Sequence, residues 1–369
     1  MRKVFEVELN SPDCDAYAAL TLPALPHAML DALERLGLAE GQLPGWRITR
    51  AYGDRNPFSL SRMEGTLPEL NVLALRLTQL NETELAIVDG LAIMAREWGG
   101  PSIPITQAID MTYSTDCCHI IEEAADDQTL GRFCAENGFV PEAESLSDEA
   151  FALLDFERIG RQFRQNERGV FTSSGYVQRW EELKQVSKNL DFTLKKPGYT
   201  ILAELPDGSR VELPTPLGKT VVEEPAQCVD CAAPALNGLT AMRSTLDQLA
   251  FRLAEMEVDG EMPKYKAVLA ATGCEDIAQA LVLADGLDQY AFDPEPREPD
   301  EVASGHLKEL LPEEELTALL PNVVLYRYGH ALMEQSGGKL TRYGYVQPAA
   351  GPVQDMIREQ TQAEGMSFV

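Results

Sequence analysis

A 23-residue stretch occurs twice in this chain, and it constrains the fold more than any other feature. Residues 156–178 read FERIGRQFRQNERGVFTSSGYVQ, and residues 325–347 read LYRYGHALMEQSGGKLTRYGYVQ, at a constant offset of 169. Eight of the 23 positions are identical: Arg158/Arg327, Gly160/Gly329, Gly169/Gly338, Thr172/Thr341, Gly175/Gly344, Tyr176/Tyr345, Val177/Val346 and Gln178/Gln347. Either the two halves of the chain are copies of one domain, or a Gly/Tyr turn has recurred by chance.

If a domain is duplicated, earlier segments must match in the same order. Three further pairs do so: the pattern L-x-x-L-A-x-R-L at 70–77 and 246–253, residues 105–109 and 277–281, and FEVEL at 5–9 with ILAEL at 201–205. The offset drifts only between 196 and 169 along the chain. The sequence therefore predicts a diverged tandem repeat.

Each copy has the same expected plan. Alternating apolar residues predict a small antiparallel β-sheet module, and apolar residues at three- and four-residue spacing predict a helical region after it. A short C-terminal α/β piece follows, so we expect an elongated α+β tandem repeat. The expected parts are copy 1 at 1–180 (a β-rich module 1–60, a helical part 61–110 and an acidic, motif-bearing part 111–180), a linker at 181–198, and a diverged copy 2 at 199–369.

Individual elements can be predicted from periodicity and from turn residues. Pro206-Asp207-Gly208 is a hairpin signal, and Asn81 is a suitable helix cap. Strands or extended pieces are expected at 5–9, 17–22, 46–49, 170–172, 176–178, 201–205 and 211–213. Helices are expected at 27–38, 70–80, 84–98, 105–113, 127–137, 147–154 and 156–166, with a short helix inside 181–198.

The net charge restricts the possible partners. Lys and Arg total 31 against 59 Asp and Glu, which gives −28 and a sequence pI near 4.5. Direct binding to nucleic acid or to an anionic membrane is disfavoured, because phosphates attract basic surfaces. No apolar stretch has the length of a membrane span, and the N-terminal residues MRKVFEVELN resemble a strand more than a signal peptide. We expect a cytoplasmic protein.

The acidic residues are concentrated in matching portions of the two copies. Residues 122–157 hold eleven carboxylates against one base, and residues 255–315 hold seventeen against four. A well-solvated acidic face tolerates such charge, but its self-repulsion suggests a use, and duplex DNA presents about one negative charge per 1.7 Å of axis. The carboxylates expected to contact a partner as a DNA-like array are Glu122, Glu123, Asp126, Asp127, Glu136, Glu142, Glu144, Asp148, Glu149, Asp155, Glu157, Asp285, Asp288, Asp293, Glu295, Glu298, Asp300 and Glu301.

A basic segment separates these two portions. Residues 158–196 hold nine basic side chains against four acidic ones. Such a segment imitates phosphate poorly, and it could instead neutralise acidic groups of its own chain.

Enzyme and metal functions have weaker support in the sequence. There is no Gly-rich phosphate loop, no G-x-S-x-G motif and no H-E-x-x-H motif, so we expect no catalytic residues and no cofactor. Cys228 and Cys231 have zinc-knuckle spacing, and Cys117, Cys118 and His119 could supply further ligands, but a single C-x-x-C pair is weak support for a metal site. The seven cysteines (Cys14, Cys117, Cys118, Cys134, Cys228, Cys231 and Cys274) are most simply free thiols.

Copy 1 contains a series of motifs in a definite order. They are L-x-x-L-A-x-R-L at 70–77, Asp116-Cys117-Cys118, Leu130-Gly131-Arg132-Phe133 with Glu136-Asn137-Gly138, LDFERIGR at 154–161, and GVFT at 169–172 with Gly175-Tyr176-Val177. In their order and spacing these motifs resemble those of the ArdA-type antirestriction proteins of plasmids and conjugative transposons. The resemblance covers most of copy 1 and extends more faintly into copy 2, which lacks a recognisable L-G-R or E-x-G.

This resemblance implies a DNA mimic without catalytic activity. Members of the family are acidic α+β proteins that occupy the DNA-binding cleft of Type I restriction–modification enzymes and so protect mobile DNA. They are typically homodimers, and a tandem repeat would fuse two such units into an internal pseudo-dimer within one chain. The alternative is a non-mimic interaction module of a mobile element that binds another basic or regulatory partner.

Overall fold

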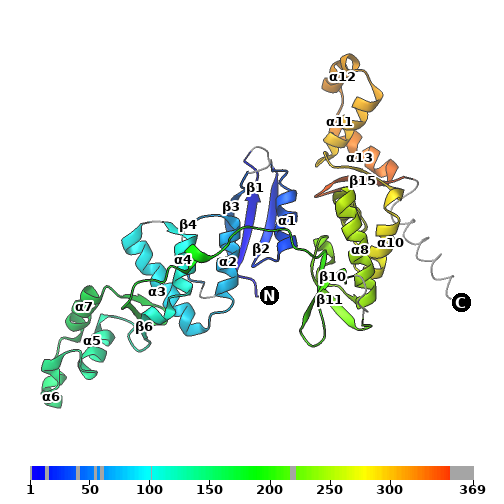
Figure 1. The fold of residues 1–369 in the computed structure, drawn as a ribbon. Helices are drawn as coiled ribbons and strands as arrows, with labels where there is room; N and C mark the ends of the chain where they lie inside the picture. Colours follow the sequence, from blue (N-terminus) through cyan, green and yellow to red (C-terminus); the bar gives the residue numbers. More distant parts are fainter. Residues whose placement is uncertain are drawn as a thin grey trace. The chain divides into compact units, whose positions relative to one another are not determined.

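The computed structural model describes residues 2–12, 16–38, 42–53, 56–58, 62–100, 102–216 and 222–349 of the chain. The fold is mixed α+β with several small, mainly antiparallel sheets (Figure 1). Two compact units are present: the first comprises Met1–Ala24 and Leu36–Leu194, and the second comprises Leu25–Arg35 and Lys195–Val369. No helix within the described ranges is long and apolar enough to cross a membrane.

The first unit begins with a three-stranded antiparallel sheet of order β2-β1-β3. Its strands are β1 (Phe5–Asn10), β2 (Tyr17–Leu22) and β3 (Gly45–Ala51), which confirms the strands predicted there. Phe5, Val7 and Leu9 are fully buried because they alternate onto one face of β1.

The helical part of the first unit follows the predicted pattern. Asn81 begins α3 as its N-cap, in a reciprocal capping box with Glu84, as the sequence predicts. The elements are β4 (Arg62–Glu64) paired in parallel with β5 (Ser102–Pro104), and helices α2 (Leu67–Leu77), α3 (Glu82–Gly99) and α4 (Ile105–Thr112).

A small α/β piece ends the first unit, and we call residues 115–179 the first terminal module. Its sheet has the order β6-β8-β7, and helices α5 and α7 pack against each other (Figure 1). The elements are η1 (Thr115–Cys117), β6 (Cys118–Ile121), α5 (Asp127–Glu136), η2 (Pro141–Ala143), α6 (Asp148–Phe151), α7 (Phe156–Glu167), β7 (Val170–Thr172) and β8 (Gly175–Arg179).

Three predicted helices are shorter in the structure. The helix expected at 147–154 is only the single turn α6. It has no buried residue, and a short helix without a packed face is not stabilised, so it does not extend further. The helix expected at 27–38 is α1 (Pro26–Glu34), and the helix expected in 181–198 is only the 3₁₀ turn η3 (Val186–Asn189). Ser187 in η3 is buried and donates two hydrogen bonds to the Asp110 carboxylate in α4.

The second unit has a four-stranded antiparallel sheet of order β10-β9-β11-β12 covered by helices. The predicted hairpin at Asp207 and Gly208 is confirmed, since the Leu205 amide donates to the Ser209 carbonyl at 2.8 Å. Helix α1 also belongs to this unit and packs on β11 and η4. The remaining elements are β9 (Ile201–Glu204), β10 (Arg210–Leu213), β11 (Pro225–Cys231), η4 (Pro234–Leu236), β12 (Thr240–Met242), α8 (Arg243–Asp259), α9 (Met262–Thr272) and α10 (Ile277–Asp285).

The second unit ends in another small α/β piece, residues 287–348, which we call the second terminal module. Its sheet has the order β13-β15-β14, and α11 packs on α13. The elements are η5 (Leu287–Gln289), β13 (Tyr290–Asp293), α11 (Pro299–Leu310), α12 (Glu313–Leu319), η6 (Leu320–Asn322), α13 (Leu325–Ser336), β14 (Lys339–Thr341) and β15 (Gly344–Pro348).

A glycine in each of the similar stretches 156–178 and 325–347 permits a close helix contact in its terminal module. A Cβ atom on Gly160 in α7 would lie 1.8 Å from the Asp127 carbonyl oxygen in α5. A Cβ atom on Gly329 in α13 would lie 1.7 Å from the Pro299 carbonyl oxygen in α11. Any other residue at these two positions would push the paired helices apart.

We therefore predict opposite effects for two Gly→Ala changes in the second terminal module. Gly329→Ala lowers the free energy of unfolding by about 1–3 kcal/mol, because the added methyl overpacks the α11–α13 contact. Gly305→Ala in α11 has open space around its Cβ and raises stability by about 0.5–1 kcal/mol through helix propensity. Urea unfolding followed by far-UV circular dichroism measures both, and a Gly329→Ala protein as stable as wild type would contradict the packing described.

Candidate acidic interaction surface

Ten of the eleven carboxylates predicted in residues 122–157 are exposed. Within the described ranges, seven of these ten neither pair with a base nor cap a helix through the side chain. They follow β6, end α5, and occupy η2 and the first turn of α6, so they belong to the loops and helix ends of one module (Figure 1). We call this set the acidic surface: Glu122, Glu123, Glu136, Glu142, Glu144, Asp148 and Glu149.

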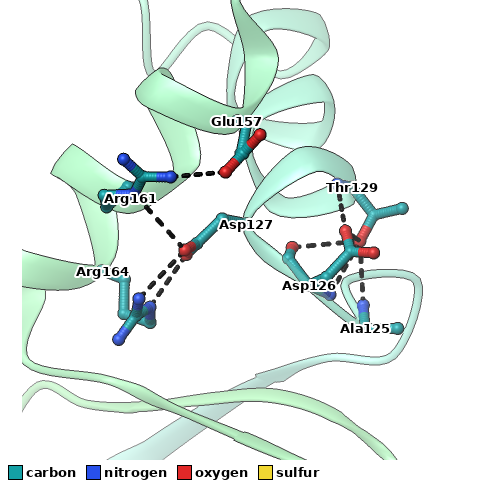
Figure 2. A network of polar contacts seen from close by, with 7 residues as sticks. All are labelled: Ala125, Asp126, Asp127, Thr129, Glu157, Arg161 and Arg164. Atoms are coloured by element: carbon teal, nitrogen blue, oxygen red, sulfur yellow. Dashed lines mark hydrogen bonds and ion pairs between the residues drawn. The ribbon is translucent and has the colours of Figure 1, made fainter.

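Asp126 has a structural role at the start of α5. Its carboxylate accepts hydrogen bonds from the Thr129 amide and hydroxyl, both at 2.8 Å (Figure 2). The Thr129 hydroxyl oxygen in turn accepts the amides of Ala125 and Asp126 at 3.0 Å. The hydrogen bonds from the Thr129 amide, and then from its hydroxyl, hold the pKa of Asp126 below its usual range. Its charge therefore stabilises the helix start.

Asp127 and Glu157 are neutralised within the first terminal module. Arg164 donates from two nitrogens to the Asp127 carboxylate at 2.8 and 3.0 Å, and Arg161 bridges Asp127 and Glu157 (Figure 2). The hydrogen bond to Asp127 raises the pKa of the Arg164 guanidinium, and the Asp127 side chain is only 17% exposed. Asp127 therefore links α5 to α7, whereas Glu157 pairs with Arg161 on its own helix and keeps an exposed side chain.

Asp155 also has a local role, since it caps α7 by accepting the Arg158 amide at 3.0 Å. It remains exposed, but one carboxylate oxygen is committed to the helix start.

Four of the nine bases in the segment 158–196 pair with carboxylates of their own chain. Besides Arg161 and Arg164, Lys184 binds Asp116 at 2.6 Å, and this hydrogen bond lowers the pKa of Asp116. Lys196 lies 3.0 Å from Glu257 in the second unit. The charges of these four bases are therefore offset by nearby carboxylates.

Several of the seven carboxylates predicted between residues 285 and 301 make local hydrogen bonds or ion pairs. Asp285 binds Arg252 at 2.8 Å, and Asp293 accepts the Glu295 amide at 3.0 Å. Glu301 accepts the backbone amides of Arg297 and Glu298 at the start of α11. Asp300 is half-buried, and its Oδ1 atom makes no hydrogen bond within the described ranges. The carboxylates of Asp288, Glu295 and Glu298 are exposed.

A pH prediction follows from the Asp126 cap. Because the folded-state pKa is depressed, the charged cap stabilises fully above the unfolded Asp pKa of about 4, and this stabilisation is lost as pH falls through the lower folded value. Asp126→Ala should therefore lower the melting temperature at pH 7 and change it little at pH 2.5. Thermal melts at the two pH values measure this, and an equal loss at both would contradict the charged cap.

The cysteines do not form a metal site in the described structure. Cys117, Cys118, Cys134, Cys228, Cys231 and Cys274 are buried free thiols, and Cys14 lies outside the described residues. Cys228 and Cys231 lie in strand β11, and burial raises the pKa of the Cys231 thiol. Within the described ranges, no group of three or more His, Cys, Asp or Glu side chains could hold a metal ion.

Two apolar side chains near the acidic surface were not singled out from the sequence. Leu153 is 86% exposed, and Phe139 is 53% exposed although its ring lies against Phe133 and Phe163. They give this surface an apolar component beside its charge.

Comparison with known proteins adds no identification. A scan against protein-family models finds no match, and a search of the curated proteins finds no significant relative.

Proposed function

We propose that this chain is an antirestriction protein that acts as an acidic DNA mimic. It would occupy the DNA-binding cleft of a Type I restriction–modification enzyme in the cytoplasm and protect mobile DNA. The carrying observation is the acidic surface: seven exposed carboxylates in one small module with no paired base among the described residues. The resemblance of its motifs to those of ArdA-type proteins supports the same function.

The acidic surface matches the chemistry of a DNA-binding cleft. Such a cleft presents Lys and Arg side chains to phosphates, and binding is driven in part by release of counterions. Carboxylates that are not committed to caps or ion pairs can take the place of phosphates there. Leu153 and Phe139 would add apolar contacts, which strengthen an interface beyond charge alone.

We also propose that the chain is a tandem repeat acting as an internal pseudo-dimer. The sheet orders β2-β1-β3 and β10-β9-β11 agree, as do β6-β8-β7 and β13-β15-β14. Register with the third strand shifts between Glu6 and Val7 in one sheet and between Leu202 and Ala203 in the other, which are equivalent places at the offset of 196. These agreements support duplication of a whole fold.

A second candidate is an interaction module that is not a mimic. It is favoured by exposed apolar side chains on the second terminal module, where Leu310, Val324 and Tyr326 are each more than half exposed. Such a surface would bind a partner through apolar burial, which salt weakens little.

Competition with DNA tests the proposed function. A Type I enzyme is incubated with a labelled duplex that carries its recognition site, and the purified protein is titrated in. Stoichiometric displacement of the duplex is expected. No displacement at a hundredfold excess would refute mimicry of this class of enzyme's substrate.

A further inference from the structure

The second terminal module contains a cavity of about 560 Å³ between its sheet and helices α11 and α13. This volume lies within the range of small-molecule and side-chain binding sites, about 300–1,000 Å³. Its walls come from β13, α11, α13 and β15, so all of them lie within one module.

The first terminal module has a packed core at the equivalent place. Phe133 and Phe163 pack there against the buried side chains of Leu130, Cys134 and Tyr176. Aromatic rings therefore fill the space between the sheet and α5 and α7.

Smaller residues occupy the corresponding positions in the second terminal module. At the offset of 172, Phe133 corresponds to Gly305, and at the offset of 169, Phe163 corresponds to the smaller Leu332. The offset of 172 also relates Asp127 to Pro299, the two residues whose carbonyls meet the paired glycines. Gly305 and Leu332 both line the cavity, and a Cβ on Gly305 would meet no atom within 4 Å.

Two apolar core positions of the first terminal module correspond to polar residues in the second. Cys134 corresponds to His306, and the buried Ile121 corresponds to Asp293. His306 and Asp293 line the cavity together with Glu309. A hollow lined by introduced polar groups differs from a packing defect, which stays apolar.

The lining combines carboxylates with aromatic rings, which suits a cation that has a flat face. Among the described residues, no Lys or Arg lines the cavity, whereas Asp293 and Glu309 contribute two carboxylates. Phe292 and Tyr345 contribute aromatic rings. A planar guanidinium can stack on a ring and bind a carboxylate through two parallel hydrogen bonds, which a compact ammonium group cannot do.

We propose that this cavity binds a guanidinium group, carried either by a small molecule or by an arginine side chain. The proposal does not depend on DNA mimicry, because the cavity is built by the second terminal module alone.

Calorimetric titration of the full chain tests the proposal with two probes. Agmatine represents a free small molecule, and the blocked tripeptide Gly-Arg-Gly represents a protein side chain, with blocked Gly-Lys-Gly as the control. Saturable binding of at least one guanidinium probe is expected at a dissociation constant of about 1 mM or below. The probe that binds more tightly identifies the source. Absence of saturation by both, or equal binding of the lysine peptide, would overturn the proposal.

Two variants locate the binding. Gly305→Phe restores the ring of the first module and should abolish binding while the melting temperature is kept or raised. Should that variant fold poorly, Asp293→Asn with Glu309→Gln keeps the shape of the cavity and should weaken binding at least about tenfold, since charge-assisted pairs are lost. Unchanged affinity in a folded form of either variant would show that the probe binds elsewhere.

Discussion

Replacing Glu142, Glu144, Asp148 and Glu149 by their amides should weaken displacement of DNA from a Type I enzyme by about 30-fold. Each exposed ion pair with a basic cleft contributes roughly 0.5 kcal/mol, and four together contribute about 2 kcal/mol. All four side chains are exposed, and none caps a helix or pairs with a base among the described residues, so the fold should be unaffected. The competition titration measures the change directly.

The matched control removes the same charge from elsewhere in the first unit. Glu82, Glu97, Glu181 and Glu182 are exposed and lie outside residues 122–157. Their replacement by Gln should change displacement by less than about threefold, because only long-range charge is lost. Equal weakening by both quadruple variants would mean that net charge acts, and not the acidic surface.

Asp31→Ala should lower the stability of the second unit by about 3 kcal/mol, the order expected when a buried ion pair loses one member. The Asp31 and Lys266 side chains are 4% and 7% exposed and lie 3.1 Å apart. Tyr343 also donates to Asp31 at 3.0 Å, and Arg35 lies 3.2 Å from it. Removing the carboxylate leaves Lys266, among the described residues, with the partly exposed Glu34 as its remaining ion-pair partner.

The tryptophans allow this effect to be assigned to one unit. Trp46, Trp98 and Trp180 all belong to the first unit, so their fluorescence follows its unfolding, whereas far-UV circular dichroism follows both units. Asp31→Ala should shift a urea transition seen by circular dichroism and leave the fluorescence transition in place. A circular-dichroism transition unchanged from wild type would contradict the buried network.

Two further variants separate charge burial from lost packing. Glu34→Gln should cost less than about 1 kcal/mol, because Glu34 is partly exposed. Asp31→Leu combined with Lys266→Met should recover most of the loss, since an apolar pair of similar volume often replaces a buried ion pair without cost.

The local elements were predictable from the sequence because their signals are local. Asn81 and the stripe from Leu70 to Leu77 specify where α2 and α3 lie. The Asp126 cap could also have been recognised, since an Asp three residues before Thr129 fits an N-terminal capping pattern. The predicted length of short helices such as α6 is too great, because apolar periodicity does not show whether the apolar face packs against another element.

The position of α1 could not be predicted from its own residues. Its stripe of Met29, Leu30 and Leu33 predicts a helix, but its buried face includes His27 and Asp31. Their partners lie far along the chain: His27 binds the Tyr199 carbonyl at 2.8 Å, and Asp31 binds Lys266. Only tertiary structure brings such groups together.

The roles of the predicted carboxylates also depend on contacts that the sequence alone does not show. An excess of acid can be counted in a sequence, but the hydrogen bond from Arg164 to Asp127 joins residues 37 positions apart and is seen only in the structure. Among the described residues, the carboxylates that have neither a paired base nor a capping role are therefore fewer than the predicted set, and they belong to loops and helix ends.

The salt dependence of inhibition tests the central claim most directly. The affinity of the protein for a Type I enzyme should be measured by competition at 50, 100 and 200 mM salt. Mimicry of a polyanion predicts a loss of at least about tenfold across this range, because binding releases counterions. Inhibition that stays constant from 50 to 200 mM salt would contradict DNA mimicry and favour an apolar interaction surface.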